Sequence, residues 1–256
     1  MKNEQTLVFG INPVREKLKA SSHDVLEILI ADRPEGPALR SIDVEAKRLG
    51  LRVTYVSPDL LSRLTGGGKH QGVLAKVEAY VHLAFTELVR RLSVSSGSDW
   101  LLILDGLTDP RNFGALLRSA EAVGVQHVVI PKNRSVGVTP TVVKASAGAV
   151  HHLNIYRATN LRRAIVTLKE RGFWMVGLDA QAEATIHEVE YPERLGIVLG
   201  SEGKGVRPII LRECDYLVSI PMLGKIASLN VAVAGAVFLY ELLRQRRTID
   251  KTGAKR

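Results

Sequence analysis

Residues 100–123, WLLILDGLTDPRNFGALLRSAEAV, decide the fold of the larger part of the chain. The apolar run Trp100–Leu104 is typical of a buried strand. A polar loop follows it, and the apolar positions of Asn112–Val123 then recur at helical spacing. A strand, a loop and a helix in this order predict one unit of a parallel α/β sheet.

The same alternation continues along the chain. It predicts a mostly parallel sheet with helices on both faces. The expected strands are His127–Ile130, Leu153–Tyr156, Phe173–Leu178, Ile197–Leu199 and Tyr216–Ile220, and the expected helices are Leu161–Arg171 and Leu229–Gln245. Ligands of such sheets bind beyond the carboxyl ends of the strands. We therefore expect the chemistry to lie in the loops that follow Leu104, Leu199 and Ile220.

The first 80 residues predict a smaller α/β domain. Pro13 after Asn12 is typical of a helix start, with Asn12 as the N-cap, and Ser57-Pro58 predicts a second start of the same kind. The other expected elements are the strands Val25–Ala31, Val53–Val56 and Gly72–Tyr80 and the helix Pro37–Leu49. We expect a domain at 1–80, a linker at 81–98 that ends in the serine-rich segment 93–98, and a second domain at 99–256.

Composition indicates a folded protein with a basic surface. Of the 256 residues, 46% are hydrophobic, and the formal net charge is +9. Such a charge favours a polyanionic partner such as RNA, although many ribosome-associated proteins are simply basic. The single cysteine, Cys214, excludes an intrachain disulfide, and we expect it to be an inert structural residue.

No segment predicts secretion or membrane insertion. The first five residues lack the apolar core of a signal peptide. The longest apolar stretch, Leu229–Tyr240, is too short to span a bilayer. We expect a cytoplasmic protein.

Residues 65–72, TGGGKHQG, form a glycine-rich loop that contains Lys69 and His70. Two interpretations remain open. The two side chains bind an RNA backbone, or the glycines merely permit a turn in a solvent-exposed loop.

Each of the three loops of the second domain also has a structural interpretation. Asn112 stands where a helix N-cap would, and Arg118, nearly two turns later, could be a surface cation. The segment 200–205, GSEGKG, has its glycines at a spacing that differs from the dinucleotide-binding pattern. Ser228 or Asn230 could cap the last helix.

Together, these motifs resemble those of the TrmH family, the SPOUT-class RNA ribose 2′-O-methyltransferases. The resemblance is carried by Asn112-Phe113-Gly114 with Arg118, by Gly200-Ser201-Glu202-Gly203, and by Ile220-Pro221 with Ser228-Leu229-Asn230-Val231. Residues 9–14 and 70–73 are similar to the family's RNA-binding domain of ribosomal-protein (L30e-like) type. Among the members, the resemblance is greatest to enzymes that methylate a guanosine in 23S ribosomal RNA. The alternatives are the same reaction on tRNA and a catalytically silent RNA-binding protein.

The resemblance implies an α/β SPOUT domain with a deep trefoil knot, a homodimer, and S-adenosylmethionine as methyl donor, with no metal. Gly200, Ile220 and Leu229 are implied as donor contacts. The arginine that matches Arg118 activates the hydroxyl in the family. Because a guanidinium stays protonated, we expect Arg118 to stabilise developing alkoxide charge and to bind the adjacent phosphate, and a role as general base is the alternative. The implied positioning residues are Asn112, Glu202, Ser228 and Asn230.

Two positions depart from the family pattern. Phe113 stands where smaller aliphatic residues are common, and Ala232 stands where serine is frequent among the 23S rRNA enzymes. Neither change removes a reacting group, so both weaken the choice of RNA more than the chemistry.

Overall fold

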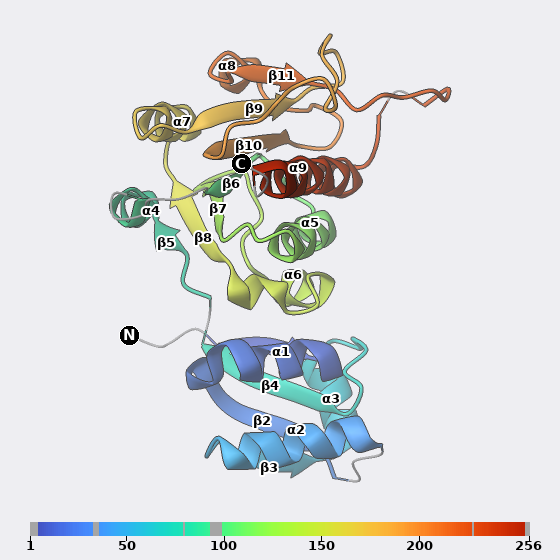
Figure 1. The fold of residues 1–256 in the computed structure, drawn as a ribbon. Helices are drawn as coiled ribbons and strands as arrows, with labels where there is room; N and C mark the ends of the chain where they lie inside the picture. Colours follow the sequence, from blue (N-terminus) through green and yellow to red (C-terminus); the bar gives the residue numbers. More distant parts are fainter. Residues whose placement is uncertain (1–4, 33–35, 79, 93–98, 227, 254–256) are drawn as a thin grey trace. The chain divides into compact units, whose positions relative to one another are not determined.

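The computed structural model describes residues 5–32, 36–78, 80–92, 99–226 and 228–253 (Figure 1). The chain forms two compact units, one of residues 1–81 with 137–152 and one of residues 82–136 with 153–256. The serine-rich segment predicted at 93–98 lies outside the described residues. The predicted domain limits and the trefoil knot stay predictions.

The first unit is built on a four-stranded mixed sheet, in agreement with the α/β domain predicted there. Its strand order is β1-β4-β2-β3, with β4 antiparallel to both neighbours and β2 parallel to β3. The strands are β1 (Gln5–Phe9), β2 (Val25–Ala31), β3 (Val53–Val56) and β4 (Val73–Glu78). The helices are α1 (Ile11–Ser21), η1 (Ser22–Asp24), α2 (Pro37–Arg48), α3 (Pro58–Leu64), α6 (Pro140–Ala145) and η2 (Ala149–His152).

The two predicted helix starts have different outcomes. Ser57 caps α3 as expected, because its hydroxyl accepts a hydrogen bond from the backbone N–H of Leu60. The prediction that Asn12 caps the first helix is wrong. Gly10 is the N-cap of α1, at φ +97°, so Asn12 already lies within the helix. Glycine adopts this backbone conformation without strain, which explains the earlier start.

His151 in η2 is a buried titratable group of the first unit. Its Nε2 atom is buried and has no hydrogen-bond partner in the described part of the chain. Burial lowers the pKa of His151 to about 4, and the positive charge of nearby Lys17 acts in the same direction. The folded protein therefore keeps this imidazole neutral at mildly acidic pH.

This histidine predicts acid sensitivity. Between pH 6.5 and 4 the unfolded chain binds a proton at His151 that the folded chain does not, so stability falls as the pH falls. Lowering the pH from 7.5 to 5.5 should reduce the free energy of unfolding by about 1 kcal/mol through this side chain. Urea unfolding at the two pH values measures the loss. In His151→Leu, the loss of unfolding free energy between the two pH values should be smaller by the contribution of His151. In His152→Gln, which changes an exposed neighbour, the loss should be the same as in the unaltered protein.

The second unit contains a seven-stranded sheet in the order β11-β9-β10-β6-β7-β8-β5. Every strand pairing in it is parallel, so the predicted parallel sheet is confirmed. The strands are β5 (Leu83–Ala84), β6 (Trp100–Asp105), β7 (His127–Pro131), β8 (Asn154–Ala158), β9 (Trp174–Leu178), β10 (Leu195–Gly200) and β11 (Tyr216–Val218). The helices are α4 (Phe85–Leu92), α5 (Pro110–Ala122), α7 (Leu161–Lys169), α8 (Pro208–Leu211) and α9 (Val231–Gly253).

Helices cover both faces of this sheet, as the apolar strands require (Figure 1). One face packs against α4, α7 and α8 in a single apolar cluster. The other packs against α5 and α9, and these two helices also contact each other. Gly235 of α9 permits close packing there, because a Cβ at this position would lie 2.5 Å from a methyl of Leu116 and 2.8 Å from one of Leu199. Within the described residues, no helix has the length and apolar character needed to cross a membrane.

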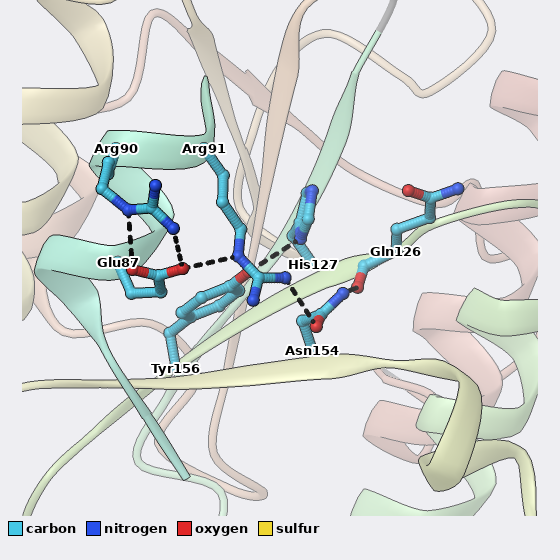
Figure 2. A network of polar contacts seen from close by, with 7 residues as sticks. All are labelled: Glu87, Arg90, Arg91, Gln126, His127, Asn154 and Tyr156. Carbon is cyan, nitrogen blue, oxygen red and sulfur yellow. Dashed lines mark hydrogen bonds and ion pairs between the residues drawn. The ribbon is translucent and has the colours of Figure 1, made fainter. Parts of the chain in front are cut away.

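A polar network fixes α4 to the amino edge of the sheet, beside the starts of β7 and β8 (Figure 2). Arg91 donates to Glu87 of its own helix and to Asn154 at the start of β8. The hydroxyl of the buried Tyr156 lies 3.2 Å from Nδ1 of His127. Burial raises the pKa of Tyr156 and lowers that of His127, so both groups are neutral at pH 7. The network thus anchors the chain where it enters the second unit.

Cys214 lies partly buried after α8. Burial raises the pKa of its thiol to about 12, and the charge of Asp215 acts in the same direction. A thiol that remains protonated is a poor nucleophile. The structure therefore agrees with the inert role predicted for this residue.

Candidate active site

The loop after β10 is a tight glycine turn. The backbone N–H of Ser201 donates to the carbonyl of Gly205 at 3.1 Å, and the N–H of Gly205 donates to the carbonyl of Ser201 at 2.9 Å. A Cβ on Gly200 would lie 1.9 Å from the carbonyl carbon of Gly205. No side chain fits at position 200, so glycine is required for the turn to fold back on the strand end.

This turn borders a cavity of about 650 Å³ at the carboxyl edge of the sheet. The second and third loops predicted from the sequence both line it. The structure therefore brings together Gly200, Ile220 and Leu229, the implied donor contacts, with three of the implied positioning residues, Glu202, Ser228 and Asn230. Ala227 of the third loop lies outside the described residues.

The first loop reaches the same place through a chain of side-chain hydrogen bonds. Nδ2 of Asn112 donates to Oε1 of Glu202, and Nδ2 of Asn230 donates to Oδ1 of Asn112 at 3.1 Å. Oδ1 of Asn230 accepts from the backbone N–H groups of Ala232 and Val233. Asn230 therefore caps α9, and it also orients the amide of Asn112.

The structural interpretation of Asn112 as an N-cap is wrong. Asp109 caps α5, because its carboxylate accepts from the backbone N–H groups of Arg111 and Asn112. Pro110 at the first position starts the helix two residues before the predicted start. The side chain of Asn112 is thereby left free to reach the glycine turn.

Arg118 lies on α5 with an exposed side chain. Within the described residues, its guanidinium makes no hydrogen bond or ion pair. A charged group that the fold does not use is available to a substrate phosphate or oxygen.

Sequence reasoning missed one wall of the cavity. Leu178, Asp179 and Ala180, at the end of β9, line it together with the predicted loops. A signal existed, because Phe173–Leu178 was an expected strand and its carboxyl end lies at the ligand-binding edge. What the sequence did not reveal is the strand order, which places β9 directly beside β10.

In the first unit, His70 is held by the protein itself. Its Nδ1 accepts from the backbone N–H of Gly72, and its Nε2 lies 3.1 Å from the hydroxyl of Ser62. The neighbouring Gln71 accepts from the backbone N–H of Ile11. Lys69 is exposed. The loop is therefore ordered by His70 and Gln71, and Lys69 is a charged side chain that it presents to solvent.

Two family models match this chain. The model of the SpoU rRNA methylase family covers residues 99–240, and the model for RNA 2′-O ribose methyltransferase substrate binding covers residues 7–82. These matches confirm the predicted enzyme class, an RNA ribose 2′-O-methyltransferase.

Curated relatives match over nearly the full chain. One is the 23S rRNA (guanosine-2′-O-)-methyltransferase RlmB of Xanthomonas campestris, which is 41% identical over 96% of this chain and 99% of its own length. Another is the putative TrmH family tRNA/rRNA methyltransferase YacO of Bacillus subtilis, which is 39% identical over 98% of this chain and 100% of its own.

The fold is also that of a solved methyltransferase. The structure of AviRb from Streptomyces viridochromogenes in complex with AdoMet superposes with a TM-score of 0.79 at 24% identity, over 95% of this chain and 91% of that one. The predicted fold class, an α/β methyltransferase domain with a smaller N-terminal domain, is thereby confirmed. With motifs, fold and full-length relatives in agreement, the chain belongs to the SpoU rRNA methylase family.

Proposed function

We propose that this protein transfers the methyl group of S-adenosylmethionine to the ribose 2′-hydroxyl of a guanosine in 23S ribosomal RNA. One observation carries the proposal. A cavity at the carboxyl edge of the sheet adjoins the hydrogen-bonded chain of Asn230, Asn112 and Glu202, while Arg118 is exposed and unpaired among the described residues.

The cavity suits S-adenosylmethionine in size and charge. A volume of about 650 Å³ lies within the usual range for small-molecule sites. Its charged lining residues are Asp179, Glu202 and Lys204, two anions and one cation. This complements a donor with a sulfonium, an ammonium and a carboxylate. We assign the donor contacts to the backbone of Gly200, Ile220 and Leu229, because loop backbone that lines the cavity offers hydrogen-bonding groups to a ligand without the help of side chains.

The remaining residues act on the acceptor. When bound in the cavity, the donor would supply an electrophilic methyl group and leave as the neutral thioether once the methyl–sulfur bond breaks, while the hydroxyl proton passes to solvent. A ribose hydroxyl attacks poorly until its proton leaves, so a fixed cation that favours the alkoxide accelerates the reaction. Arg118 provides this cation. Asn112, Glu202, Ser228 and Asn230 position the ribose and its phosphate by hydrogen bonds, which holds the reacting atoms in line.

Similarity over the full chain and the match of the N-terminal residues both support 23S rRNA as the substrate. The chain is 41% identical to RlmB of X. campestris over 99% of that protein. The name of RlmB gives 2′-O-methylation of a guanosine in 23S rRNA as its reaction. The substrate-binding model spans residues 7–82, and the net charge of +9 favours RNA. We propose that Lys69 contacts a phosphate there and that His70 supports its loop. Such a substrate places the reaction in the cytoplasm.

Mapping 2′-O-methylated positions tests the function. Purified protein, S-adenosylmethionine and unmethylated 23S rRNA should give one new methylated guanosine. Parallel reactions with total tRNA separate the two RNA classes, because methylation of tRNA alone would replace the proposed substrate. Absence of methylation on both, with RNA binding intact, would indicate a silent RNA-binding protein.

We further propose that the enzyme is a homodimer that buries one face of α9. Val233, Val237 and Tyr240 follow each other at helical spacing and are 49%, 40% and 54% exposed, while Phe238 and Leu239 of the same helix are fully buried. The exposed stripe continues to Leu229, which also lines the cavity. A second copy is the favoured partner, because a two-fold axis pairs such a stripe with itself. The site residues then lie next to the subunit interface.

A charge in this stripe should separate the subunits. Val237→Glu buries an unpaired carboxylate in the interface, so we expect the dimer dissociation constant to rise about 100-fold, equivalent to about 3 kcal/mol. Analytical ultracentrifugation across a dilution series measures it. Val44→Glu is the matched control, because Val44 is 65% exposed on α2 of the first unit. A Val237→Glu protein that remains as dimeric as the control would exclude this interface.

A further inference from the structure

Asp105 and Arg207 form an unusually complete ion pair beside the cavity. Asp105 is the last residue of β6, and its side chain is fully buried. Its carboxylate accepts from the backbone N–H of Arg207 at 2.9 Å and from Nε at 2.8 Å, and Nη2 of the same arginine lies 2.7 Å from Oδ1. Backbone and guanidinium of one residue thus hold a single carboxylate.

This pair closes the glycine turn at its base. Asp105 is the register partner of Gly200 on the adjacent strand, so the loop leaves the sheet beside Asp105. Seven residues later, the chain returns to the carboxylate of Asp105 through Arg207. Both ends of the loop that holds Glu202 are therefore fixed to one residue of β6.

Asp105 also starts the loop that leads to α5. Four residues after it, Asp109 caps the helix, and the side chain of Asn112 then reaches Glu202. A shift of Asp105 would move Asn112 and Glu202 relative to each other. The ion pair therefore joins the start of the first loop of the site to the end of the second.

We propose that Asp105 and Arg207 are positioning residues that hold the glycine turn over the donor cavity and align Glu202 with Asn112. This inference rests on the proposed function of that site. A bidentate arginine–carboxylate pair defines orientation as well as distance. An apolar pair would fill the same space without fixing the angle of the turn.

Three single variants test the pair. Asp105→Asn keeps the size of the side chain and one acceptor but loses the charge. Arg207→Lys keeps the charge but loses the planar fork. In the intact protein we expect kcat for methyl transfer to fall about 100-fold in Asp105→Asn, and the Kd for S-adenosylmethionine, measured by calorimetry without RNA, to rise about tenfold. Arg207→Lys should retain more activity than Arg207→Gln, because it keeps part of the pairing.

The control is an ion pair of similar chemistry away from the cavity. Nε of Arg162 lies 2.6 Å from Oε1 of Glu213, and neither residue lines the cavity. Glu213→Gln should leave both kcat and the donor Kd unchanged. Each protein is assayed well below its unfolding midpoint, because a merely structural pair would lower that midpoint and leave kcat of the folded protein unaltered.

The positioning role of Asp105 and Arg207 and the methyltransferase function are tested by different measurements. Donor binding and methyl transfer by the unaltered protein establish the function whatever the variants do. Asp105→Asn with unaltered kcat and donor Kd would overturn the positioning role. If Asp105→Asn does not fold, the two Arg207 variants provide the test. Equal activity of Arg207→Lys and Arg207→Gln, with unaltered donor affinity, would also overturn the positioning role.

Discussion

Arg118→Ala is expected to reduce kcat for methyl transfer by a factor of about 10² to 10³. This is the usual effect of removing one group that stabilises a developing oxyanion. The variant should bind S-adenosylmethionine with unchanged affinity, because Arg118 does not line the cavity. It should also fold normally, because the exposed guanidinium has no partner among the described residues. Single-turnover methylation of 23S rRNA and calorimetry with the donor measure the two quantities.

Arg163→Ala is the matched control for Arg118. Arg163 is another exposed arginine, on α7, which packs on the opposite face of the sheet. Its removal should change kcat little, whereas a general loss of positive charge would affect both variants alike. Turnover of Arg118→Ala at the rate of the Arg163→Ala protein would remove Arg118 from the mechanism. Arg118→Lys should fall between, since it keeps the charge without the fork.

Gly200→Ala should weaken donor binding strongly. The added methyl would lie 1.9 Å from the carbonyl carbon of Gly205 and 2.1 Å from the backbone nitrogen of Val206, so backbone must move. Because the turn forms one wall of the cavity, a displacement of about 1 Å should weaken productive binding about 100-fold. Equilibrium dialysis with labelled S-adenosylmethionine measures the loss.

Gly203→Ala separates steric conflict from backbone strain in the same turn. Gly203 has φ +77°, and a Cβ there meets no atom within 4 Å. Only the left-handed conformation penalises alanine, by about 1–2 kcal/mol, so donor affinity should fall much less than in Gly200→Ala. Equal losses in the two variants would mean that the close approach at Gly200 does not shape the cavity.

The sequence alone predicts most strands of the second unit, although β5 (Leu83–Ala84) lies in the segment predicted as a linker. Buried parallel strands are apolar throughout, so Trp100–Leu104 and Ile197–Leu199 were recognisable without any tertiary information. The loops were identified in a different way. Gly200 and Asn112 belong to short motifs that were recognised through their resemblance to those of the TrmH family.

Helix starts were predicted less well, because several residues compete for each cap. Asn12 and Asn112 are both good caps in isolation, yet Gly10 and Asp109 take those places. The first residue of a helix is determined by the position at which the preceding strand or loop ends. Local propensity is a weak term in that choice.

Sequence by itself determined that three strand-end loops with Gly200, Glu202, Asn230 and their neighbours belong to one site, because the carboxyl ends of parallel strands share an edge. Only the tertiary structure decided the strand order that adds Asp179 to the cavity, the bond from Asn112 to Glu202, and the return of Arg207 to Asp105. These contacts join residues up to 102 positions apart. No local pattern encodes them, because they depend on which strands become neighbours when the whole sheet packs.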